Sequence, residues 1–441
     1  MTSFVHRTMN GLKRRALMRL VPQKVNLRPL LQPLVLGEQA AVSDLSQQVN
    51  RELHRHLHGY SGIAPEYIGT LVNAVQELWA SPDRATVHEA ELAQMTRDVP
   101  PTALPARRWF ALYDVCFTYG LFDLLLPLRA KAVESAFEEE QRRPNRWWSV
   151  EFAFRAAMNQ GQFAEAERLL GRLETLTKHQ DKLTSYRLFY LFLTGQKDAA
   201  APLACKFVKH HANSELFRKL IEGRRVAVVG PAPTGELTGE EIDAHDIVVR
   251  INYRGADRLG DPAEFGTRTD VSYYNGQDSR YMHDKKDYEF LGDLQACAFK
   301  SFSHKFQLQQ QSKGAAREIV RPRLLFNGAA LQGLNAVYDL LHFAPEELKL
   351  FKNNLFLSTN PYDEKYREYH IDRTGRIGNA PNERLSSFTT HDLLSHHAML
   401  SELRNARCML TDGALDSVLE MGEPTFIRNL RAIYLEDDRG Q

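Results

Sequence analysis

The sequence predicts two structural parts: an all-α helical-repeat region and an α/β domain built on a doubly wound parallel sheet. Helical periodicity runs from residue 41 to about residue 222 with few strand signals. At Gly223 the pattern changes to short β-branched runs that end in glycine and polar residues. Strand and helix signals then alternate over residues 223–441, which is typical of a sheet covered by helices on both faces.

The composition excludes several classes of protein. A chain of 441 residues is long enough for two domains, and its net charge of +1 argues against nucleic acid as the main partner. The four cysteines are widely spaced and form no C-x-x-C pair, so we expect the reduced, structural thiols of a cytoplasmic protein. No run of about 18 apolar residues and no signal-peptide core is present, so we expect neither a transmembrane helix nor a cleaved signal.

Residues 1–40 form a basic leader ahead of the helical region. Within the leader, Met9–Val21 is a short basic amphipathic segment. Such a segment could lie on an anionic membrane surface, which would give a cytoplasmic protein a peripheral membrane contact. The alternative is a solvated helix or a disordered leader.

Three short segments of the helical region share one pattern. Each begins with a glycine, at Gly120, Gly161 and Gly195, and lies between two segments of helical periodicity. The intervals between these glycines, 41 and 34 residues, are close to the period of tetratricopeptide-like helix pairs. The pattern predicts a divergent helical repeat that offers a surface to a protein partner, and an irregular helical bundle is the alternative.

The strand signals of the α/β domain are clearest in its first fifty residues. Val226–Val229, Ile247–Val249 and Val271–Tyr274 are short apolar runs rich in β-branched or aromatic residues, as in buried parallel strands. Polar loops follow these runs, and the carboxyl ends of strands are where open α/β sheets bind ligands. Further strands are expected at residues 297–299, 323–326 and 354–357, with a helix from about Leu331 to Phe343.

Two common glycine motifs fit the first loop badly. Gly230 and Gly235 have the spacing of a P-loop, but Glu236-Leu237 follows where Lys-Ser/Thr should stand, and a carboxylate repels a phosphate. The dinucleotide fingerprint is interrupted by Pro231-Ala232-Pro233. The sequence therefore argues against both kinds of site.

Three pieces of this segment form a longer pattern. They are Val228-Val229-Gly230, then Glu241-Ile242-Asp243-Ala244-His245-Asp246-Ile247-Val248-Val249-Arg250-Ile251-Asn252, then Gly266-Thr267-Arg268-Thr269-Asp270. Their order and spacing resemble the long sialylmotif of the eukaryotic-type sialyltransferases, glycosyltransferase family 29. One position departs from that motif: Pro231 stands where the family usually has an Asn that contacts the nucleotide phosphate and the acceptor side. Proline has no N–H and no side-chain amide, so that contact must come from elsewhere or is absent.

The resemblance implies a Rossmann-like sheet of the sialyltransferase type, a variant of the GT-A fold. Animal members of the family are Golgi proteins with an N-terminal anchor and disulfides, and we expect neither here. The resemblance therefore points to a bacterial relative in the cytoplasm, with or without peripheral contact with the inner membrane.

A second motif of the family has a weaker counterpart at Leu331-Gln332-Gly333. Gln332 replaces the usual hydroxyl residue, and Ser358-Thr359-Asn360 replaces the Tyr-Gly-Phe-type turn that follows the next strand. A glycine that opens a helix lets backbone N–H groups approach a phosphate, so Gln332 and Gly333 are candidate donor-site residues. The alternative is an ordinary connection between a strand and a helix.

His391 is the candidate catalytic base. Thr389-x-x-Asp392 is a capping-box pattern, so a helix is expected to begin there with His391 in its first turn. The positive end of the helix disfavours an imidazolium, and a neutral His is what a general base requires. The segment resembles the very short sialylmotif, although His396 stands where that motif has Glu. A second register, His397 to Glu402, restores the spacing, and a structural capping role is the alternative.

The resemblance also suggests an upstream His-Tyr motif whose His contacts the donor phosphate. Tyr369-His370 is the nearest counterpart, and it makes His370 a further candidate. Arg367, Arg373 and Arg376 could hold a phosphate or a carboxylate, or they could form a solvated loop.

The implied function is transfer of a sialic acid or Kdo (3-deoxy-manno-octulosonic acid) from its CMP-activated form. The acceptor would be a hydroxyl of a surface glycan, in a capsule, lipopolysaccharide or lipooligosaccharide, and the helical region could also bind the growing glycan. The reaction would be an inverting single displacement. The candidate donor-site residues are Gly230, Ala232, Asn252, Asn275, Gln332, Gly333 and His370. The sequence contains no D-x-D triplet, so we expect no metal and no cofactor beyond the CMP-sugar itself.

Two other classes of function stay open. One is a different nucleotide-binding α/β transferase, such as a methyltransferase or an enzyme that uses another nucleotide sugar. The other is a non-catalytic helical-repeat adaptor, which the substitutions at Pro231, Gln332 and His396 would permit.

Overall fold

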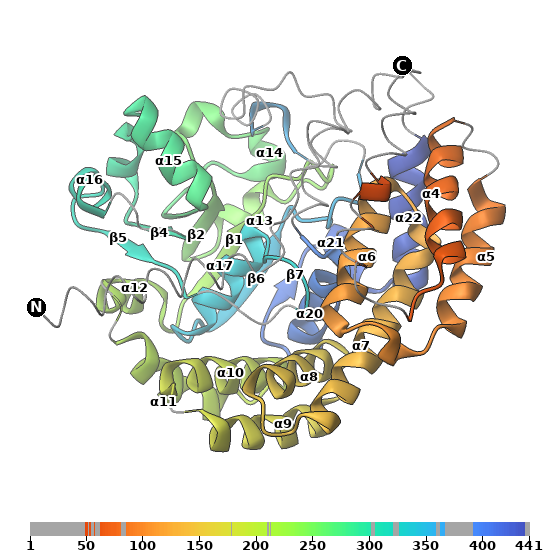
Figure 1. Cartoon of the computed structure of the whole chain (residues 1–441). Helices are drawn as coiled ribbons and strands as arrows, with labels where there is room; N and C mark the ends of the chain where they lie inside the picture. The colour runs from red at the N-terminus through yellow and green to blue at the C-terminus, as the bar shows by residue number, and fades with distance from the viewer. Residues whose placement is uncertain are drawn as a thin grey trace, which may run out of the picture.

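A computed structural model describes residues 49–51, 53, 57, 62–80, 85–177, 179–209, 211, 213–300, 305–320, 326–358, 362–366 and 391–436. A helical array curves below and to the right of a parallel sheet (Figure 1). Within this described part of the chain, no helix combines the length and the apolar character needed to cross a membrane. The segment Met9–Val21 and the expected strand at 323–326 are outside it, apart from Phe326 itself.

The first half of the chain is helical throughout its described residues. Its elements are α4 (Pro65–Ala80), α5 (Ala85–Asp98), the 3-10 helix η2 (Pro101–Ala103), α6 (Ala106–Tyr119), the 3-10 helix η3 (Phe122–Leu124), α7 (Leu125–Arg142), α8 (Trp147–Asn159), α9 (Phe163–Leu176), α10 (Gln180–Leu193), α11 (Lys197–Val208) and α12 (Ser214–Ile221). Successive helices from α6 to α11 pack against each other as pairs, α6 with α7, α8 with α9 and α10 with α11.

The three glycines of the shared sequence pattern sit at equivalent turns between paired helices. Gly120, Gly161 and Gly195 all have a left-handed backbone, with φ of 86°, 65° and 72°. At each turn the residue after the glycine donates its N–H to a carbonyl five residues earlier, for example Gln162 to Ala157 O at 2.9 Å. This is the Schellman geometry, in which glycine avoids the steric cost of a left-handed residue. The pattern therefore marks a true structural repeat of helix, glycine turn and helix.

The second half contains a seven-stranded sheet in the order β5-β4-β3-β2-β1-β6-β7, with every neighbouring pair parallel. The strands are β1 (Arg225–Val229), β2 (Ile247–Ile251), β3 (Val271–Tyr274), β4 (Ala296–Phe299), β5 (Ala316–Glu318), β6 (Glu347–Phe351) and β7 (Leu410–Thr411). The chain runs outward from β1 to β5 and then returns to place β6 on the other side of β1. The strand order therefore reverses between β1 and β6, which is the point where ligands bind in open α/β sheets.

Helical elements connect the strands and cover the sheet. They are α13 (Gly239–Asp243), η4 (Ala256–Arg258), α14 (Pro262–Phe265), α15 (Gly276–Lys285), η5 (Glu289–Asp293), α16 (Lys305–Gln311), α17 (Gln332–Leu341), α20 (Leu393–Asn405), α21 (Gly413–Leu419) and α22 (Glu423–Glu436). Alternate strand residues belong to different cores: Val226 and Val228 pack into the core shared with the helical array, whereas Ala227 and Val229 pack with Phe265 on the opposite face. Both faces are therefore buried, as the continuous apolar runs of the strands require.

The predicted α/β architecture and the strands at β1 to β4 agree with the structure, as does the helix α17. The strand expected at residues 354–357 is wrong, because Leu355 and Phe356 have left-handed backbones with φ of 48° and 66°. These two side chains are buried by a turn and not by a sheet. The strand of this region is β6, where Leu348 and Leu350 are buried and Glu347 and Lys349 are half-buried. The short strands β5 and β7 were not predicted.

The helical array and the α/β part share one continuous hydrophobic core. The last helix, α22, packs against η3 of the helical array. Arg431 of α22 pairs with the buried Glu89 at 2.9 Å and with Asp123 at 3.1 Å. The change of structural class at residue 223 is therefore real, but the carboxyl-terminal helix packs on the helical array.

Candidate functional site

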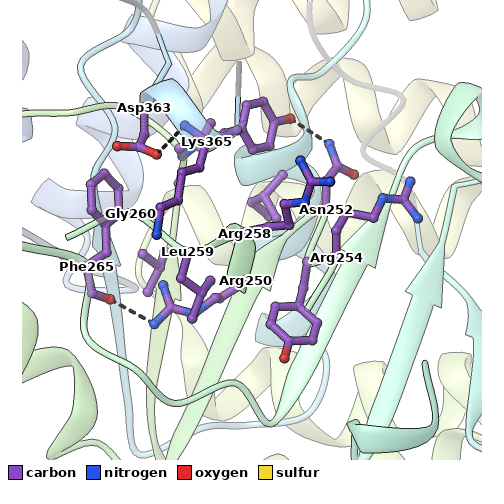
Figure 2. Close-up of a pocket in the computed structure, with 15 residues that line it drawn as sticks. Arg250, Asn252, Arg254, Arg258, Leu259, Gly260, Phe265, Asp363 and Lys365 are labelled. Atoms are coloured by element: carbon purple, nitrogen blue, oxygen red, sulfur yellow. Dashed lines mark hydrogen bonds between the residues drawn. The ribbon is translucent and has the colours of Figure 1, made fainter. Parts of the chain in front are cut away.

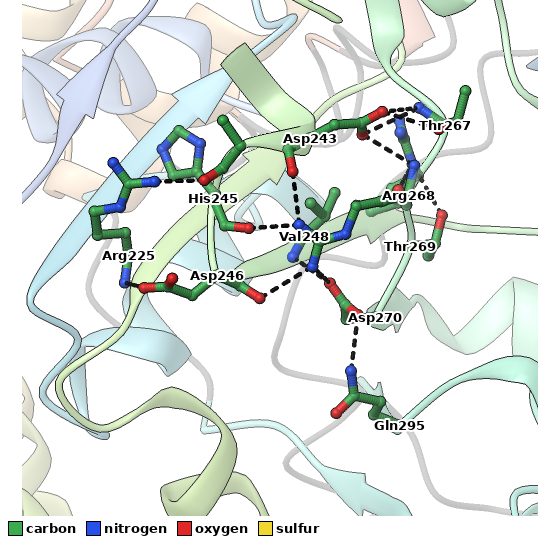
Figure 3. Close-up of polar contacts among 12 residues, drawn as sticks. Arg225, Asp243, His245, Asp246, Val248, Thr267, Arg268, Thr269, Asp270 and Gln295 are labelled. Carbon is green, nitrogen blue, oxygen red and sulfur yellow. Dashed lines mark hydrogen bonds and ion pairs between the residues drawn. The ribbon is translucent and has the colours of Figure 1, made fainter. Parts of the chain in front are cut away.

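The residues of the long motif that precede the strands form a polar network at the amino edge of the sheet (Figure 3). The Asp243 carboxylate accepts hydrogen bonds from the backbone N–H groups of Thr267 and Arg268 and from the Thr267 hydroxyl, at 2.8–3.1 Å. Arg268 donates to the carbonyls of Asp243 and His245, both at 2.6 Å. Asp270 accepts from the N–H of Val248 at 2.8 Å. The network ties the loop before β2 to the loop before β3.

This network explains why the motif needs these residue types. Burial alone would raise the pKa of Asp243, but the hydrogen bonds from Arg268 and Thr267 outweigh burial and lower the pKa. The carboxylate is therefore held ionised by donors that belong to the fold. Because these residues lie at the amino ends of parallel strands, their role here is structural.

A pocket lies at the opposite, carboxyl edge of the sheet, beside the reversal point of the strand order (Figure 2). It is lined by Val229, Gly230, Pro231, Arg250, Ile251, Asn252, Tyr253, Arg254, Arg258, Leu259, Gly260, Phe265, Asp363, Lys365 and Tyr366. The cavity itself has a volume of about 50 Å³, and the space rises to about 500 Å³ when the open mouth is counted.

Asn252 occupies a strained and buried position in this pocket. Its backbone is left-handed, with φ of 57°, and its side chain is only 5% exposed. The amide Nδ2 donates to the Tyr366 hydroxyl at 2.7 Å, while the buried Oδ1 has no hydrogen-bond partner. A buried acceptor without a partner is costly, and an Asn with a left-handed backbone at a pocket wall is typical of a functional site. Asn252 is one of the predicted donor-site residues, and it lines this pocket.

Four cationic side chains line the pocket, against one carboxylate, that of Asp363. Arg250 lies at the base, where it donates to the carbonyls of Phe265 and Arg268 at 2.8 and 2.9 Å. Burial lowers its pKa to about 10, against the opposing charge of Asp243. Arg254 pairs with the buried Asp278 at 3.6 Å, whereas Arg258 and Lys365 are exposed. The excess of positive charge favours an anionic ligand.

Most of these cations were not among the predicted site residues. Arg254 and Arg258 follow the carboxyl end of β2 directly, so their position after a recognisable strand was the available signal. Lys365 and Tyr366 carried no local signal, because they join the pocket only through folding. The N–H of Asp363 donates to the carbonyl of Pro231 at 2.7 Å and brings this distant segment to the first loop.

Gly230 and Ala232 are predicted donor-site residues, but both backbone N–H groups are bonded within the fold and are not offered to a phosphate. The N–H of Gly230 donates to the carbonyl of Phe351 at 2.9 Å, and that of Ala232 donates to the carbonyl of Lys352 at 3.2 Å. Pro231 between them has no N–H. Gly230 is required for another reason: a Cβ there would lie 2.4 Å from the Lys352 carbonyl oxygen. The glycine thus lets β1 and β6 continue side by side beyond the sheet.

The buried Lys352 anchors the rest of this loop. Its ammonium donates to the Thr234 hydroxyl at 3.0 Å and to the Glu236 carbonyl at 2.6 Å, and it pairs with Glu264 at 3.2 Å. The side chain is fully buried. Lys352 therefore fixes the loop with P-loop-like glycine spacing from within.

Asn275, Gln332 and Gly333 also lie at the carboxyl edge, but they do not line the pocket. Asn275 accepts the N–H of Asp278 at 2.9 Å, which makes it a cap of helix α15. Gln332 begins α17, where its Oε1 accepts from Asn335 at 3.3 Å and its buried Nε2 has no partner. A Cβ on Gly333 would lie 3.3 Å from the amide nitrogen of Asn353, so α17 starts close to the end of β6.

His391 precedes its helix and does not lie in the first turn. Helix α20 begins at Leu393 with Asp392 as its N-cap residue, so the capping-box prediction placed the start too early. The His391 ring lies 5.9 Å from the His396 ring, and its Nδ1 bonds to the carbonyl of Ala329 at 2.5 Å. A carbonyl oxygen only accepts hydrogen bonds, so Nδ1 of His391 carries a proton. Nε2 is therefore the nitrogen that can take up a further proton.

His396 is a structural residue and not a second catalytic group. Its Nδ1 donates to the Asp392 carbonyl at 2.6 Å, and its Nε2 accepts the N–H of Leu331 at 2.8 Å. Both ring nitrogens are thus committed to a neutral imidazole. Burial lowers the pKa of His396 to about 4, although the bond to Asp392 opposes this shift. The alternative register at His397 is also structural, since its Nε2 bonds to the Val418 carbonyl at 3.0 Å.

His370 and the basic residues Arg367, Arg373 and Arg376 lie outside the described residues. Among the residues that are described, no group of three His, Cys, Asp or Glu side chains is placed to hold a metal ion. The geometry therefore offers three parts for chemistry: the cationic pocket, the start of α17, and His391.

Comparison with known proteins gives little further information. No family model matches the chain, and no curated protein matches it at a significant level. Among solved structures, an O-GlcNAc transferase variant from Thermobaculum terrenum aligns with 86% of this chain and 99% of its own. The identity is 9% and the TM-score is 0.22, which is too low to support a conclusion about fold or function.

Proposed function

We propose that the protein is a glycosyltransferase that moves a sialic acid or Kdo from its CMP-activated form to a sugar hydroxyl. The observation that carries this proposal is the cationic pocket at the carboxyl edge of β1 and β2, with the partnerless Oδ1 of Asn252 in its wall. The segment that builds this pocket is the one that resembles the long sialylmotif. An α/β domain of the sialyltransferase type, as a GT-A variant, belongs to the same proposal.

The pocket suits the leaving group of such a donor. Arg254, Arg258 and Lys365 supply positive charge for the phosphate, which gathers negative charge as the bond to the sugar breaks. The Oδ1 of Asn252 accepts a hydrogen bond, and the amino group of cytosine or a ribose hydroxyl can donate one. The backbone N–H groups of Gly230 and Ala232 take no part, because they bond to the end of β6.

His391 is the proposed base at the acceptor side. A chain of contacts connects it with the pocket along the carboxyl edge: Gly230 abuts Lys352, Asn353 abuts Gly333, and the loop before α17 bonds to His391. In the reaction, Nε2 of His391 takes the proton of the acceptor hydroxyl. The hydroxyl oxygen forms a bond to the anomeric carbon while the bond from that carbon to the phosphate oxygen breaks, and CMP leaves.

The direct test is incubation of the protein with CMP-Neu5Ac and with CMP-Kdo, separately, while the release of CMP is measured. Release from one donor, in the presence of a glycan acceptor and of excess chelator, would support both the assignment and a metal-independent reaction. Stabilisation against heat by a uridine sugar or by S-adenosylmethionine, with no response to CMP, would contradict it and favour another nucleotide-binding transferase. Binding of CMP without any transfer would favour a non-catalytic adaptor.

His391→Ala is expected to lower kcat by about 10²–10⁴-fold, the usual contribution of a general base. The dissociation constant of CMP should stay within about threefold of the wild-type value, because His391 does not line the pocket. Calorimetry with CMP and a turnover assay would separate the two effects. Unchanged turnover would remove the base assignment.

A further inference from the structure

A buried polar cluster joins the helical array to the start of α20. The Asp392 carboxylate, which is completely buried, accepts hydrogen bonds from the Tyr113 hydroxyl at 2.8 Å, the Arg129 guanidinium at 2.7 Å and the Ser395 hydroxyl at 2.5 Å. The same guanidinium donates to the Ser395 hydroxyl at 2.9 Å and to the side chain of Asn159. Tyr113 of α6 and Arg129 of α7 bond to the carboxylate directly, and Asn159 of α8 bonds to Arg129, so three helices of the array take part in the cluster.

This arrangement is unusual for an N-cap residue. An Asp at this position normally accepts a backbone N–H of its own helix, and Asp392 makes no such bond. Its carboxylate turns instead to the helical array. Burial alone would raise its pKa, but the charge of Arg129 and the bonds from Ser395, Arg129 and Tyr113 outweigh burial and lower it. The cluster is therefore a built ion pair whose donors come mainly from another part of the fold.

The same helices also hold the loop that accepts the hydrogen bond of His391. Asn327 donates to Asp114 of α6 at 2.8 Å, and the ring of Phe326 lies 4.5 Å from that of Phe110, also of α6. Two residues further along this loop, the Ala329 carbonyl bonds to Nδ1 of His391. The array thus fixes His391 from two sides, through the neighbouring Asp392 and through the Ala329 loop.

We propose that Arg129 is a positioning residue for His391 and that the helical array, besides any role in binding partners, sets the geometry of the catalytic base. This inference rests on the proposed function in one respect, the role of His391 as the base. Arg129 does not touch His391 in any described contact. It acts through Asp392, which has no freedom to move while its carboxylate is held by Arg129 and Tyr113.

The test uses the full-length protein with both charges of the pair removed, as Arg129→Met/Asp392→Asn. Removing Arg129 alone would leave a buried carboxylate without its cation, which destabilises the fold itself. Turnover should fall about 10–100-fold, which is the effect of displacing a reacting group by about 1 Å. The dissociation constant of CMP should change by less than about threefold. The rate at which the His391 Nδ1 proton exchanges with solvent, measured by NMR, should rise about tenfold. Arg129→Lys, with Asp392 unchanged, keeps a cation beside the carboxylate. Its turnover and its exchange rate should lie between those of the double variant and those of wild type.

The matched control is Glu89→Gln/Arg431→Met, which removes another buried ion pair of the helical array that does not touch residues 391–396. It should leave the exchange rate and the turnover within about twofold of wild type. Equal effects in the control and in the Arg129 variant would overturn the inference, and so would an unchanged exchange rate in the Arg129 variant.

Two further outcomes are covered by a second variant and by a measurement that needs no turnover. If the double variant does not fold, Tyr113→Phe removes one hydroxyl from Asp392, and an unchanged exchange rate in that variant overturns the inference. If the wild-type protein transfers no sugar from either CMP donor, the proposed function fails. The exchange measurement still decides whether Arg129 positions His391, because it needs no turnover.

Discussion

The two edges of the parallel sheet differ although one stretch of sequence supplies both. At the amino edge, Asp243, Arg268 and Asp270 have their polar groups bonded to each other or to the backbone of neighbouring loops. At the carboxyl edge, Asn252 keeps a buried acceptor without a partner, beside exposed cations. A motif that resembles a family signature can therefore hold two kinds of residue, some that build the fold and some that line a pocket.

The difference has a geometric cause. At the carboxyl edge, the loops that leave β1 and β2 do not fill the space above the strand ends, and the pocket lies there, beside the reversal of the strand order. At the amino edge, the loops before β2 and β3 lie against each other and their polar groups can pair directly. Substitutions at the two edges should thus affect different measurements.

The largest effect is expected at the amino edge, for Asp243→Ala. The variant loses an ionised acceptor of three hydrogen bonds, so the free energy of unfolding should fall by about 2–4 kcal/mol, as measured by urea denaturation. The affinity for CMP should not change in the folded protein. Glu240→Ala, on the exposed surface of the same short helix, is the control and should change the stability by less than about 0.5 kcal/mol.

The pH dependence sharpens this prediction. The pKa of Asp243 in the folded protein lies below its ordinary value of 3.8. The stabilisation from this carboxylate is therefore complete above the pKa of the unfolded chain and is lost as the pH falls through the folded value. The difference in stability between wild type and Asp243→Ala should narrow below about pH 4. A difference that stays constant to pH 2 would show that the carboxylate charge is not what stabilises this edge.

An intermediate effect, on ligand affinity, is expected at the carboxyl edge for Asn252→Gly. Glycine accepts the left-handed backbone of this position, so the change removes the side chain without adding backbone strain. We expect the affinity for CMP to fall about 10–100-fold, since one buried hydrogen-bonding group is lost from the site. The stability should fall by only about 1 kcal/mol, because the bond from Nδ2 to Tyr366 is lost but the Oδ1 is unsatisfied in the free protein. If Asn252→Gly lowered the stability and left the affinity for CMP unchanged, Asn252 would be a structural residue like those of the amino edge.

The smallest effect is expected for Arg258→Ala at the mouth of the pocket. An exposed cation near a phosphate contributes modestly, so CMP should bind about two- to fivefold more weakly. The difference from wild type should shrink as the salt concentration rises from 0.05 to about 0.5 M, because salt screens exposed charges. Arg224→Ala, an exposed cation just before β1 at the amino edge, should leave CMP binding unchanged at every salt concentration.

Local sequence patterns predicted most of the secondary structure that surrounds the site. The β-branched runs at Val226–Val229 and Ile247–Val249 form the strands β1 and β2, because apolar runs of this length are stable only when both faces are buried. The three glycines predicted the turns of the helical repeat, because left-handed residues at helix ends favour glycine strongly. The alternation that marks β6 was also present in the sequence, but the neighbouring Leu355 and Phe356 resembled a strand more closely.

The candidate site was only partly predictable, because local patterns identify residues beside a recognisable strand but not residues that reach the pocket through folding. Asn252 was identified because it ends a recognisable strand inside a recognisable motif. Lys365 and Tyr366 could not be identified, since they reach the pocket through a bond between Asp363 and Pro231 that joins residues far apart in the chain. The helix before which His391 lies was placed one turn too early, because Asp392 was taken as part of a capping box and its carboxylate is in fact bound elsewhere.

The sequence by itself determined the two structural classes, the glycine turns, the central strands and the edge of the sheet that carries the pocket. These follow from local periodicity and backbone preference, which act over a few residues. Only the tertiary structure decided that Arg129 holds Asp392, that Lys352 fixes the first loop and that Gly230 and Ala232 have no free N–H. Those contacts depend on how separate helices and strands pack, and no local pattern records which buried charges will meet.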